Sequence, residues 1–292
     1  MITFRYHVVT LVAVFMAIGL GVLFGATFID QNIVDGLRAA QVRLGDRNES
    51  LRDRILELER QNEAVETFAS STRDLIVRGA LEDVSVVLVS FEGTPGESLD
   101  AVRQTLTLAG GRFDGHVTLS DGLDLRSEEN RERLAAALGS DSDDAEALSQ
   151  TLVTELGTAL LGQNPNFLSR LVERELASTP VAIAAPLDPA PVVVVVGGDI
   201  PREVTNRVAV PLLRLLGETS TVAAAAASGT EVNLLRQIRG DSDLQAVTVD
   251  SIDTPLSQSA LAIGLRAALA GQFGHYGLAE GATTALPVTG PG

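Results

Sequence analysis

PVVVVVGGD, from Pro191 to Asp199, places five consecutive valines between a proline and a pair of glycines. Valine favours strands, and a strand that is apolar at every position is typical of a parallel sheet covered on both faces. Parallel strands are joined by crossover connections, which are usually helices. The stretch therefore predicts an α/β domain.

The sequence on both sides of the valines alternates strand-like and helix-like segments, as a parallel sheet with right-handed crossovers requires. The predicted strands are 84–90, 117–119, 192–196, 222–227 and 246–249, and the predicted helices are 97–109, 127–138, 145–161, 164–177, 203–216, 231–239 and 256–270. Pro211 predicts a kink. The alanine run 223–227 also has high helix propensity, but a strand preserves the alternation. We therefore predict a mostly parallel, Rossmann-like domain over 79–277, followed by a disordered tail, 278–292.

A leucine zipper is predicted over 30–78, directly before this domain. Apolar residues recur every seven positions, and the partner core positions contain apolar and polar residues. In heptad notation, d holds Leu37, Leu44, Leu51, Leu58 and Val65, and a holds Val34, Gln41, Asn48, Ile55, Asn62, Ala69 and Ile76. Leucine at d with Val or Ile at a favours two parallel strands, and polar a residues fix register. The alternative is one amphipathic helix folded onto its own domain, but the seam is narrower than such a helix normally shows.

The zipper is preceded by 24 uncharged residues, from Tyr6 to Ile29. As a helix this run is about 36 Å long, enough to cross a bilayer. Arg5 before it and Asp30 after it favour an N-terminus in the cytoplasm and a chain that is otherwise extracytoplasmic. A cleaved signal peptide is the alternative, but its apolar core is shorter and ends in small residues. A single apolar helix also favours the cytoplasmic membrane over the outer membrane, whose spanning proteins are closed barrels.

Small residues form a stripe along this predicted anchor, at Ala13, Ala17, Gly21 and Gly25. Their spacing of four places them on one helix face, where two helices can approach closely. Ala and Gly are also simply common in membrane helices. A parallel dimer nevertheless agrees with the zipper, because both chains enter from the same side of the membrane.

Composition excludes several classes of function. The 292 residues carry 22 basic residues, all of them Arg, against 38 acidic ones, a net charge of −16 that opposes nucleic-acid binding. There is no Cys, which excludes disulfides, thiolate metal sites and Cys nucleophiles. No complete dinucleotide-binding or P-loop motif is present, and neither downstream histidine has a nucleophile motif beside it. We therefore expect a protein that is not an enzyme, with a hidden α/β hydrolase as an alternative.

Loops after parallel strands are where an open α/β sheet binds ligands. The predicted loops carry Glu92, Asp121, Asp199 and Asp250. Such residues also cap helices. If they converged with His275, then Glu92, Asp199 and His275 are the candidate metal ligands, with His275 completing its site in the fold or across a dimer. We expect no resident cofactor.

The chain resembles the actinobacterial MctB family. The resemblance covers essentially the whole chain and is carried by Arg5-Tyr6-His7-Val8-Val9-Thr10-Leu11-Val12-Ala13-Val14-Phe15, the Gly-rich segment that follows, the coiled coil, Val86-Val87-Leu88-Val89-Ser90 and Gly274-His275-Tyr276-Gly277. That family is labelled mycobacterial copper transport protein, and its SteB branch is described as a division-associated partner of the membrane protein SteA.

The resemblance implies a role in copper homeostasis or efflux, or in a cell-division complex. Copper(I) prefers thiolate and thioether ligands, and beyond the predicted anchor the chain has neither Cys nor Met. We therefore expect a dimeric, non-catalytic envelope scaffold that presents its α/β domain to an envelope or division partner. Direct copper binding through His275 and strand-end carboxylates is the alternative.

Overall fold

The computed structural model describes residues 4–184, 187, 189–229 and 233–287, without the side chains of 4–5, 26–35 and 233. The chain divides into two compact units, Met1–Val65 and Glu66–Gly292. One helix, α1 (Phe4–Val77), occupies the first unit and enters the second. Its apolar part, Tyr6–Gly25, has a mean hydropathy of 2.6 and enough length to cross a membrane. The predicted anchor is therefore part of a single helix. Among the predicted zipper residues, Val34 is the one whose side chain lies outside the described residues.

The second unit is an α/β domain built on a seven-stranded sheet, in the order β3-β2-β1-β4-β5-β6-β7. The strands are β1 (Ser85–Phe91), β2 (Arg112–Leu119), β3 (Ala177–Val181), β4 (Val192–Gly197), β5 (Val222–Ala226), β6 (Val247–Val249) and β7 (His275–Tyr276). All neighbouring pairs are parallel except β2 and β3. The predicted mostly parallel sheet is confirmed, with the valine run at its centre.

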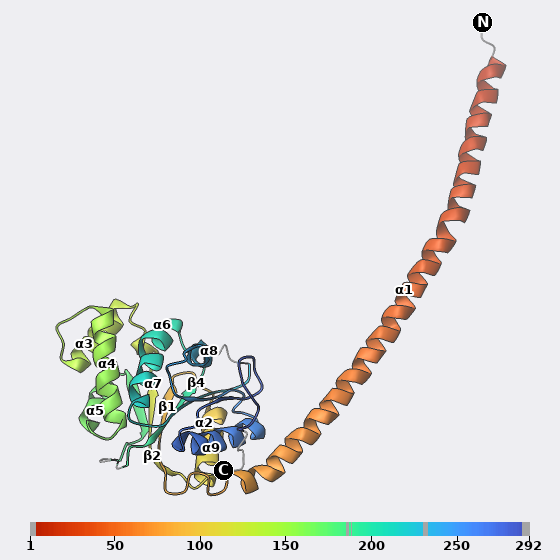
Figure 1. Ribbon diagram of the computed structural model, residues 1–292. Coiled ribbons are helices and arrows are strands. Elements are labelled where there is room, and N and C mark those ends of the chain that lie inside the picture. Colours follow the sequence, from red (N-terminus) through yellow and green to blue (C-terminus); the bar gives the residue numbers. More distant parts are fainter. Residues whose placement is uncertain (1–3, 185–186, 188, 230–232, 288–292) are drawn as a thin grey trace. The chain divides into compact units, whose positions relative to one another are not determined.

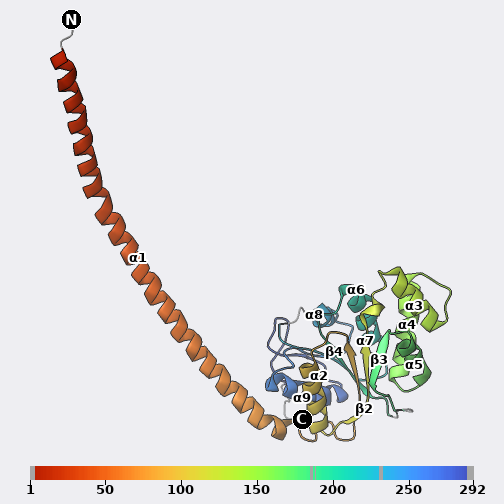
Figure 2. The same cartoon turned by 180° about the vertical axis from the view of Figure 1, so that it is seen from behind.

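Helices cover both faces of the sheet, as the valine run requires (Figure 1). The helices are α2 (Gly96–Leu108), α3 (Glu128–Leu138), α4 (Ala145–Leu160), α5 (Pro165–Glu173), α6 (Arg202–Val204), α7 (Val210–Gly217), α8 (Asn233–Gly240) and α9 (Pro255–Leu269), with short turns η1 (Asp121–Leu123) and η2 (Thr205–Ala209). Apolar residues of α3, α4, α5, α7 and α8 form one core with one face of the sheet. Those of α2 and α9 form a second core with the other face, and Figure 2 shows these two helices together.

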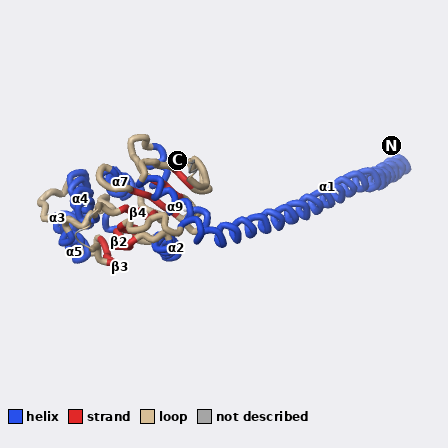
Figure 3. Tube along the Cα trace, turned by 60° about the horizontal axis from the view of Figure 1, so that its bottom comes forward, coloured by secondary structure: helices blue, strands red, loops and turns tan. Residues whose placement is uncertain are grey.

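The structure corrects several predicted boundaries. The second strand begins at Arg112, not at 117. Its first half, 112–116, is mostly polar and therefore lacks the apolar run on which the prediction depended. The predicted helix 164–177 ends at Glu173, and Ala177–Val181 forms the antiparallel edge strand β3 instead. Pro180 lies in that strand, which is consistent with an edge position, where no partner needs its missing N–H. Figure 3 shows β3 beside β2.

Two further differences occur near Pro211 and at the C-terminal side of the domain. The predicted kink takes the form of the π-helical turn η2, directly before α7. Pro211 cannot donate to the carbonyl of Arg207, so the preceding turn widens. The alanine run is a buried strand, as predicted.

The first part of the predicted disordered tail is hydrogen-bonded to the α/β unit. The backbone N–H of Gly277 donates to the carbonyl of Thr284, and that of Thr283 donates to the carbonyl of His275. Residues 288–292 of that tail lie outside the described residues.

Candidate functional site

The strand order of the sheet reverses between β1 and β4. At such a switch point, α/β folds usually form a binding crevice beyond the carboxyl ends of the strands. In this chain the two loops touch. A Cβ atom on Gly198 would lie 3.0 Å from the Cα atom of Thr94, and Thr94 Oγ1 is 3.5 Å from the carbonyl oxygen of Val196. Gly198 is therefore needed for the close approach of the two loops at this point.

Glu92 lies at this edge beside β2. Its Oε2 accepts a hydrogen bond of 3.2 Å from the backbone N–H of Asp121. A shallow depression of about 360 Å³ lies next to it, lined in part by Thr118, Ser120 and Glu175. Burial, and then the negative charges of Glu92 and Asp124, raise the pKa of Asp121. Glu92 and Asp121 are thus brought together, as parallel strand ends predict, but the hydrogen bond to the backbone gives Glu92 a structural role.

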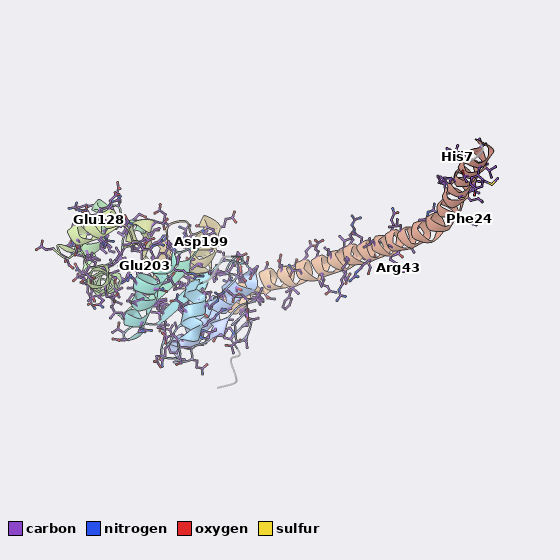
Figure 4. The ribbon with its side chains drawn as sticks, turned by 90° about the horizontal axis from the view of Figure 1, so that it is seen from above. His7, Phe24, Arg43, Glu128, Asp199 and Glu203 are labelled. Carbon is purple, nitrogen blue, oxygen red and sulfur yellow. The ribbon has the colours of Figure 1, made fainter. Side chains whose placement is uncertain are left out.

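Asp199 follows β4 and is exposed, as Figure 4 labels it on the surface of the α/β unit. Asp250, which follows β6, has the opposite environment. Its side chain is 2% exposed and pairs with Arg239 of α8, whose side chain is 8% exposed, at 2.7 Å. Of the four predicted strand-end acids, Asp250 is therefore the one that is committed to a buried ion pair.

Asp250 holds the segment that follows β7 in place. Its Oδ1 accepts hydrogen bonds from the backbone N–H groups of Leu278 at 2.6 Å and Ala279 at 2.9 Å. Burial alone would raise the pKa of Asp250, but the hydrogen bonds from Arg239, Ala279 and Leu278 outweigh it and hold the pKa below its usual value. A Cβ atom on Gly277 would overlap the carboxylate, so glycine is required there.

Arg239 completes this arrangement, which we call the C-terminal latch: Arg239, Thr248, Asp250 and residues 275–280. The guanidinium also donates to the carbonyl of Tyr276 at 3.0 Å, to that of Glu280 at 3.1 Å and to Thr248 Oγ1 at 3.0 Å. The Tyr276 ring packs so closely that a Cβ atom on Gly264 would lie 2.9 Å from its Cε2. The contacts of Tyr276 with Arg239 and of Gly277 with Asp250 give the Gly274-His275-Tyr276-Gly277 motif a structural role. No signal in the sequence singles out Arg239, because one arginine among 22 does not reveal its burial.

His275, the predicted metal ligand, lies in β7 beside the latch. Its Nδ1 is 3.0 Å from Thr248 Oγ1. Burial, and then the positive charge of Arg239, lower the pKa of His275, which favours the neutral ring. A neutral ring with one nitrogen fixed by a hydrogen bond is oriented as a metal-binding histidine normally is.

The structure does not bring His275 together with Glu92 and Asp199. Strands β5 and β6 separate β7 from β4, so the lateral distance alone is about 14 Å at roughly 4.8 Å per strand. Within the described residues, no group of three His, Asp or Glu side chains is close enough to hold a metal ion. A metal site formed by these three residues in one copy of the chain therefore has no geometric support.

A serine–histidine pair, which the sequence does not reveal, lies between β1 and β2. Ser90 Oγ is 2.9 Å from His116 Nε2 and 2.9 Å from Thr118 Oγ1. Burial, and then the charge of Arg103, lower the pKa of His116. Ser90 is fully buried, so a substrate has no access to its hydroxyl. The burial and these hydrogen bonds are consistent with a structural role for His116.

The predicted dimer residues lie along α1, and all of them except Gly25 are exposed. Leu37, Leu44, Leu51, Leu58 and Val65 are between 54% and 68% exposed, and Ile55 is 52% exposed. Asn48, Asn62, Ala13, Ala17 and Gly21 are exposed, and Gly25 is half-buried. A Cβ atom on Gly21 or Gly25 would meet nothing within 4 Å. Figure 4 shows His7 and Phe24 on the apolar part of this helix and Arg43 further along it.

Ala69 differs from the other predicted zipper positions. It is 8% exposed, although Ala64, less than two turns earlier, is exposed. One turn after Ala69, Arg73 Nη1 donates to Gln258 Oε1 of α9 at 2.7 Å, and Val77 belongs to the core formed with α2 and α9. The prediction that Ala69 lies in the zipper seam is therefore wrong, because the α/β unit of the same chain covers it.

Comparison with known proteins gives one consistent result. The family described as "Copper transport outer membrane protein, MctB" matches residues 1–287. Proteins named copper transporter MctB from Mycobacterium bovis and Mycobacterium tuberculosis are 27% identical over 97% of this chain and 98% of their own length. The Mycobacterium leprae protein of the same name is 25% identical over the same shares. A solved catalytic subunit of M. jannaschii aspartate transcarbamoylase covers 71% of this chain and 92% of its own, but its TM-score of 0.15 and 12% identity support no argument.

Proposed function

The chain belongs to the MctB family of copper transport proteins, and from this premise we propose that it is a single-pass protein of the cytoplasmic membrane that acts in copper homeostasis as a parallel homodimer. Its N-terminus lies in the cytoplasm and its α/β unit outside. The dimer is a non-catalytic scaffold that presents two α/β units to an envelope partner. A membrane protein of the division machinery, similar to SteA, is the partner that the family resemblance favours.

The observation that carries the dimer is the uncovered seam. Five d-position side chains in the first unit are more than half exposed, at the sevenfold spacing of a zipper. Exposing such a row to water is unfavourable by about 25 cal/mol for each Å² of apolar surface. A second copy covers it with the same residues in the same register. Asn48 and Asn62 then lie in the seam, where polar residues favour one register over others.

Two features of the α/β unit support a role without catalysis. The loops after β1 and β4 contact each other at the point where the strand order reverses, through Thr94 and Gly198. The serine that has a histidine partner, Ser90, is fully buried. Among the described residues, the contact of these two loops and the burial of Ser90 are what favour recognition of a partner protein over turnover of a small substrate.

Copper is the cargo in this function and not a resident cofactor of the chain. The chain has no Cys, and its two Met residues lie at or before the end of the apolar span. Soft donors that could pass copper(I) from one ligand to the next are thus missing from the α/β unit. We infer that the protein supports copper handling by organising a partner.

The zipper is tested by replacing Leu51 and Leu58 with Asp in the full chain, purified in detergent. Buried carboxylates at two d positions should convert the dimer to a monomer, measured by sedimentation or light scattering. The matched control replaces Val42 and Leu56 with Asp, because these b-position residues are 61% and 54% exposed and lie off the seam. A wild-type monomer, or equal effects of both double variants, would contradict the proposal.

Direct copper binding through His275 is a second candidate, favoured by the hydrogen bond of 3.0 Å between Thr248 Oγ1 and His275 Nδ1, which orients the ring. In a dimer the two His275 side chains supply a pair of imidazoles if the α/β units meet. Titration of the full chain with copper(II) should then show saturable binding that His275→Ala removes and His116→Ala does not. Binding that His275→Ala leaves unchanged excludes this site.

A further inference from the structure

The last turns of α1 carry an apolar patch that nothing in the described part of the chain covers. Phe68 is 68% exposed, Leu75 is 80% exposed and Ile76 is 45% exposed. All three lie in the second unit, on the part of α1 that packs onto α9 through Arg73 and Gln258. Each side chain is large and apolar, so exposing the patch to water is unfavourable in free energy.

The zipper heptad changes character at this patch. Between residues 47 and 61 the g positions hold Arg47, Arg54 and Gln61, whereas the next two g positions hold Phe68 and Leu75. The change occurs where Ala69, at a, becomes buried against the chain's own α/β unit and Arg73, at e, bonds to Gln258. At this level of the helix, therefore, the g positions become apolar, whereas the neighbouring a and e residues, Ala69 and Arg73, face the α/β unit of the same chain.

Phe68 and Leu75 form a core-like series with their neighbours at d. Val65, Phe68, Thr72 and Leu75 are spaced by three, four and three residues, which is the spacing of alternating core positions in a coiled coil. The hydroxyl of Thr72 donates to the carbonyl of Phe68 at 2.7 Å, so it needs no other partner. This series is displaced around the helix from the a and d series by one heptad position.

We propose that the interface between two copies continues past Val65 through Phe68 and Leu75, with the seam turned from the a and d positions to the d and g positions. The occupant of the patch is a second copy of this chain, because the series is continuous with the zipper and a parallel partner presents the same residues at the same level. This inference rests on the dimer proposed above. It makes the last turns of α1 a neck that links the zipper to the two α/β units.

The absence of cysteine from the chain permits a direct test by disulfide crosslinking in native membranes. Single variants Leu51→Cys, Phe68→Cys, Leu75→Cys, Ile76→Cys and Thr67→Cys of the full chain are oxidised with diamide and separated on non-reducing gels. Crosslinking requires Cβ atoms about 4 Å apart. Thr67, at the exposed f position, is the matched control beside Phe68.

The expected result is a species of twice the mass from Leu51→Cys, Phe68→Cys and Leu75→Cys, with at least tenfold slower crosslinking of Thr67→Cys and Ile76→Cys. If Leu51→Cys crosslinks while Leu75→Cys does not, or if Ile76→Cys reacts faster than Leu75→Cys, the turned neck is wrong and the zipper stands. Crosslinking at Leu75 but not at Leu51 supports the neck and contradicts the zipper. If no variant crosslinks, both proposals fail.

Discussion

Apolar residues have opposite surroundings in the two units of the chain. Val192–Val196 are at most 2% exposed, because helices cover both faces of their sheet. Leu44 in the first unit is 68% exposed. The strands of the α/β unit are therefore covered within one copy of the chain, whereas apolar side chains of the first unit are exposed in that copy. The comparison suggests that the stability of the α/β unit and the oligomeric state of α1 are controlled by separate residues.

The largest effect on the α/β unit is expected from Asp250→Asn. The substitution leaves the buried Arg239 guanidinium without its counter-charge, and breaking a buried pair costs about 3 to 5 kcal/mol of unfolding free energy. Urea denaturation of the full chain in detergent, followed by pulse proteolysis, measures this loss. Dimerisation should be unchanged.

The control for Asp250→Asn is Asp100→Asn, which removes a pair whose side chains are 57% and 52% exposed. Exposed pairs contribute at most about 1 kcal/mol. If the two variants lose the same stability, the latch does not hold the C-terminal segment as the structure indicates. If Asp250→Asn also dissociates the dimer, the two units are not independent.

A smaller effect is expected from Gly277→Ala, which tests the closeness of the latch. The added Cβ would overlap the Asp250 carboxylate, and the backbone φ of +131° disfavours a side chain. Overpacking of this kind costs about 1 to 3 kcal/mol. Gly271→Ala is the matched control, because φ is +81° there and nothing lies within 4 Å. Equal losses in urea denaturation would show that backbone strain, and not the carboxylate, requires glycine at 277.

The sequence predicts the parts of the fold that depend on local pattern. The valine run, the strand–helix alternation and the apolar helix are confirmed, because hydrophobic periodicity reports which faces are buried. Strands β3 and β7 were missed, since each is short and is defined by its pairing with a distant strand. Propensity favoured a helix for the alanine run, and its position in the sheet made it a strand.

The candidate site was less predictable than the fold. Strand-end acids were identified from their order in the sequence, but only the packing shows that Asp250 is buried and Asp199 is exposed. Arg239 and Thr248 were not identified, because their roles depend on contacts across 9 and 11 residues and on the return of the chain at Tyr276. Likewise, heptad counting placed Ala69 in the seam, since it cannot detect a helix whose side turns toward its own domain.

The smallest effect is expected from pH, through His116 and His275. Burial lowers the pKa of both rings below 6.5 in the folded chain, with Arg103 and Arg239 as the secondary causes. As pH falls through about 6.5, the unfolded chain therefore binds protons before the folded chain does, and the free energy of unfolding decreases. The decrease ends once the folded rings are also protonated. Urea denaturation of the α/β unit at about pH 7.5 and about pH 5.5 measures it, and the double variant His116→Gln, His275→Gln should show a smaller difference. An equal pH dependence in the variant would assign it to other groups, and a dimer that dissociates over the same range would connect the histidines to the first unit.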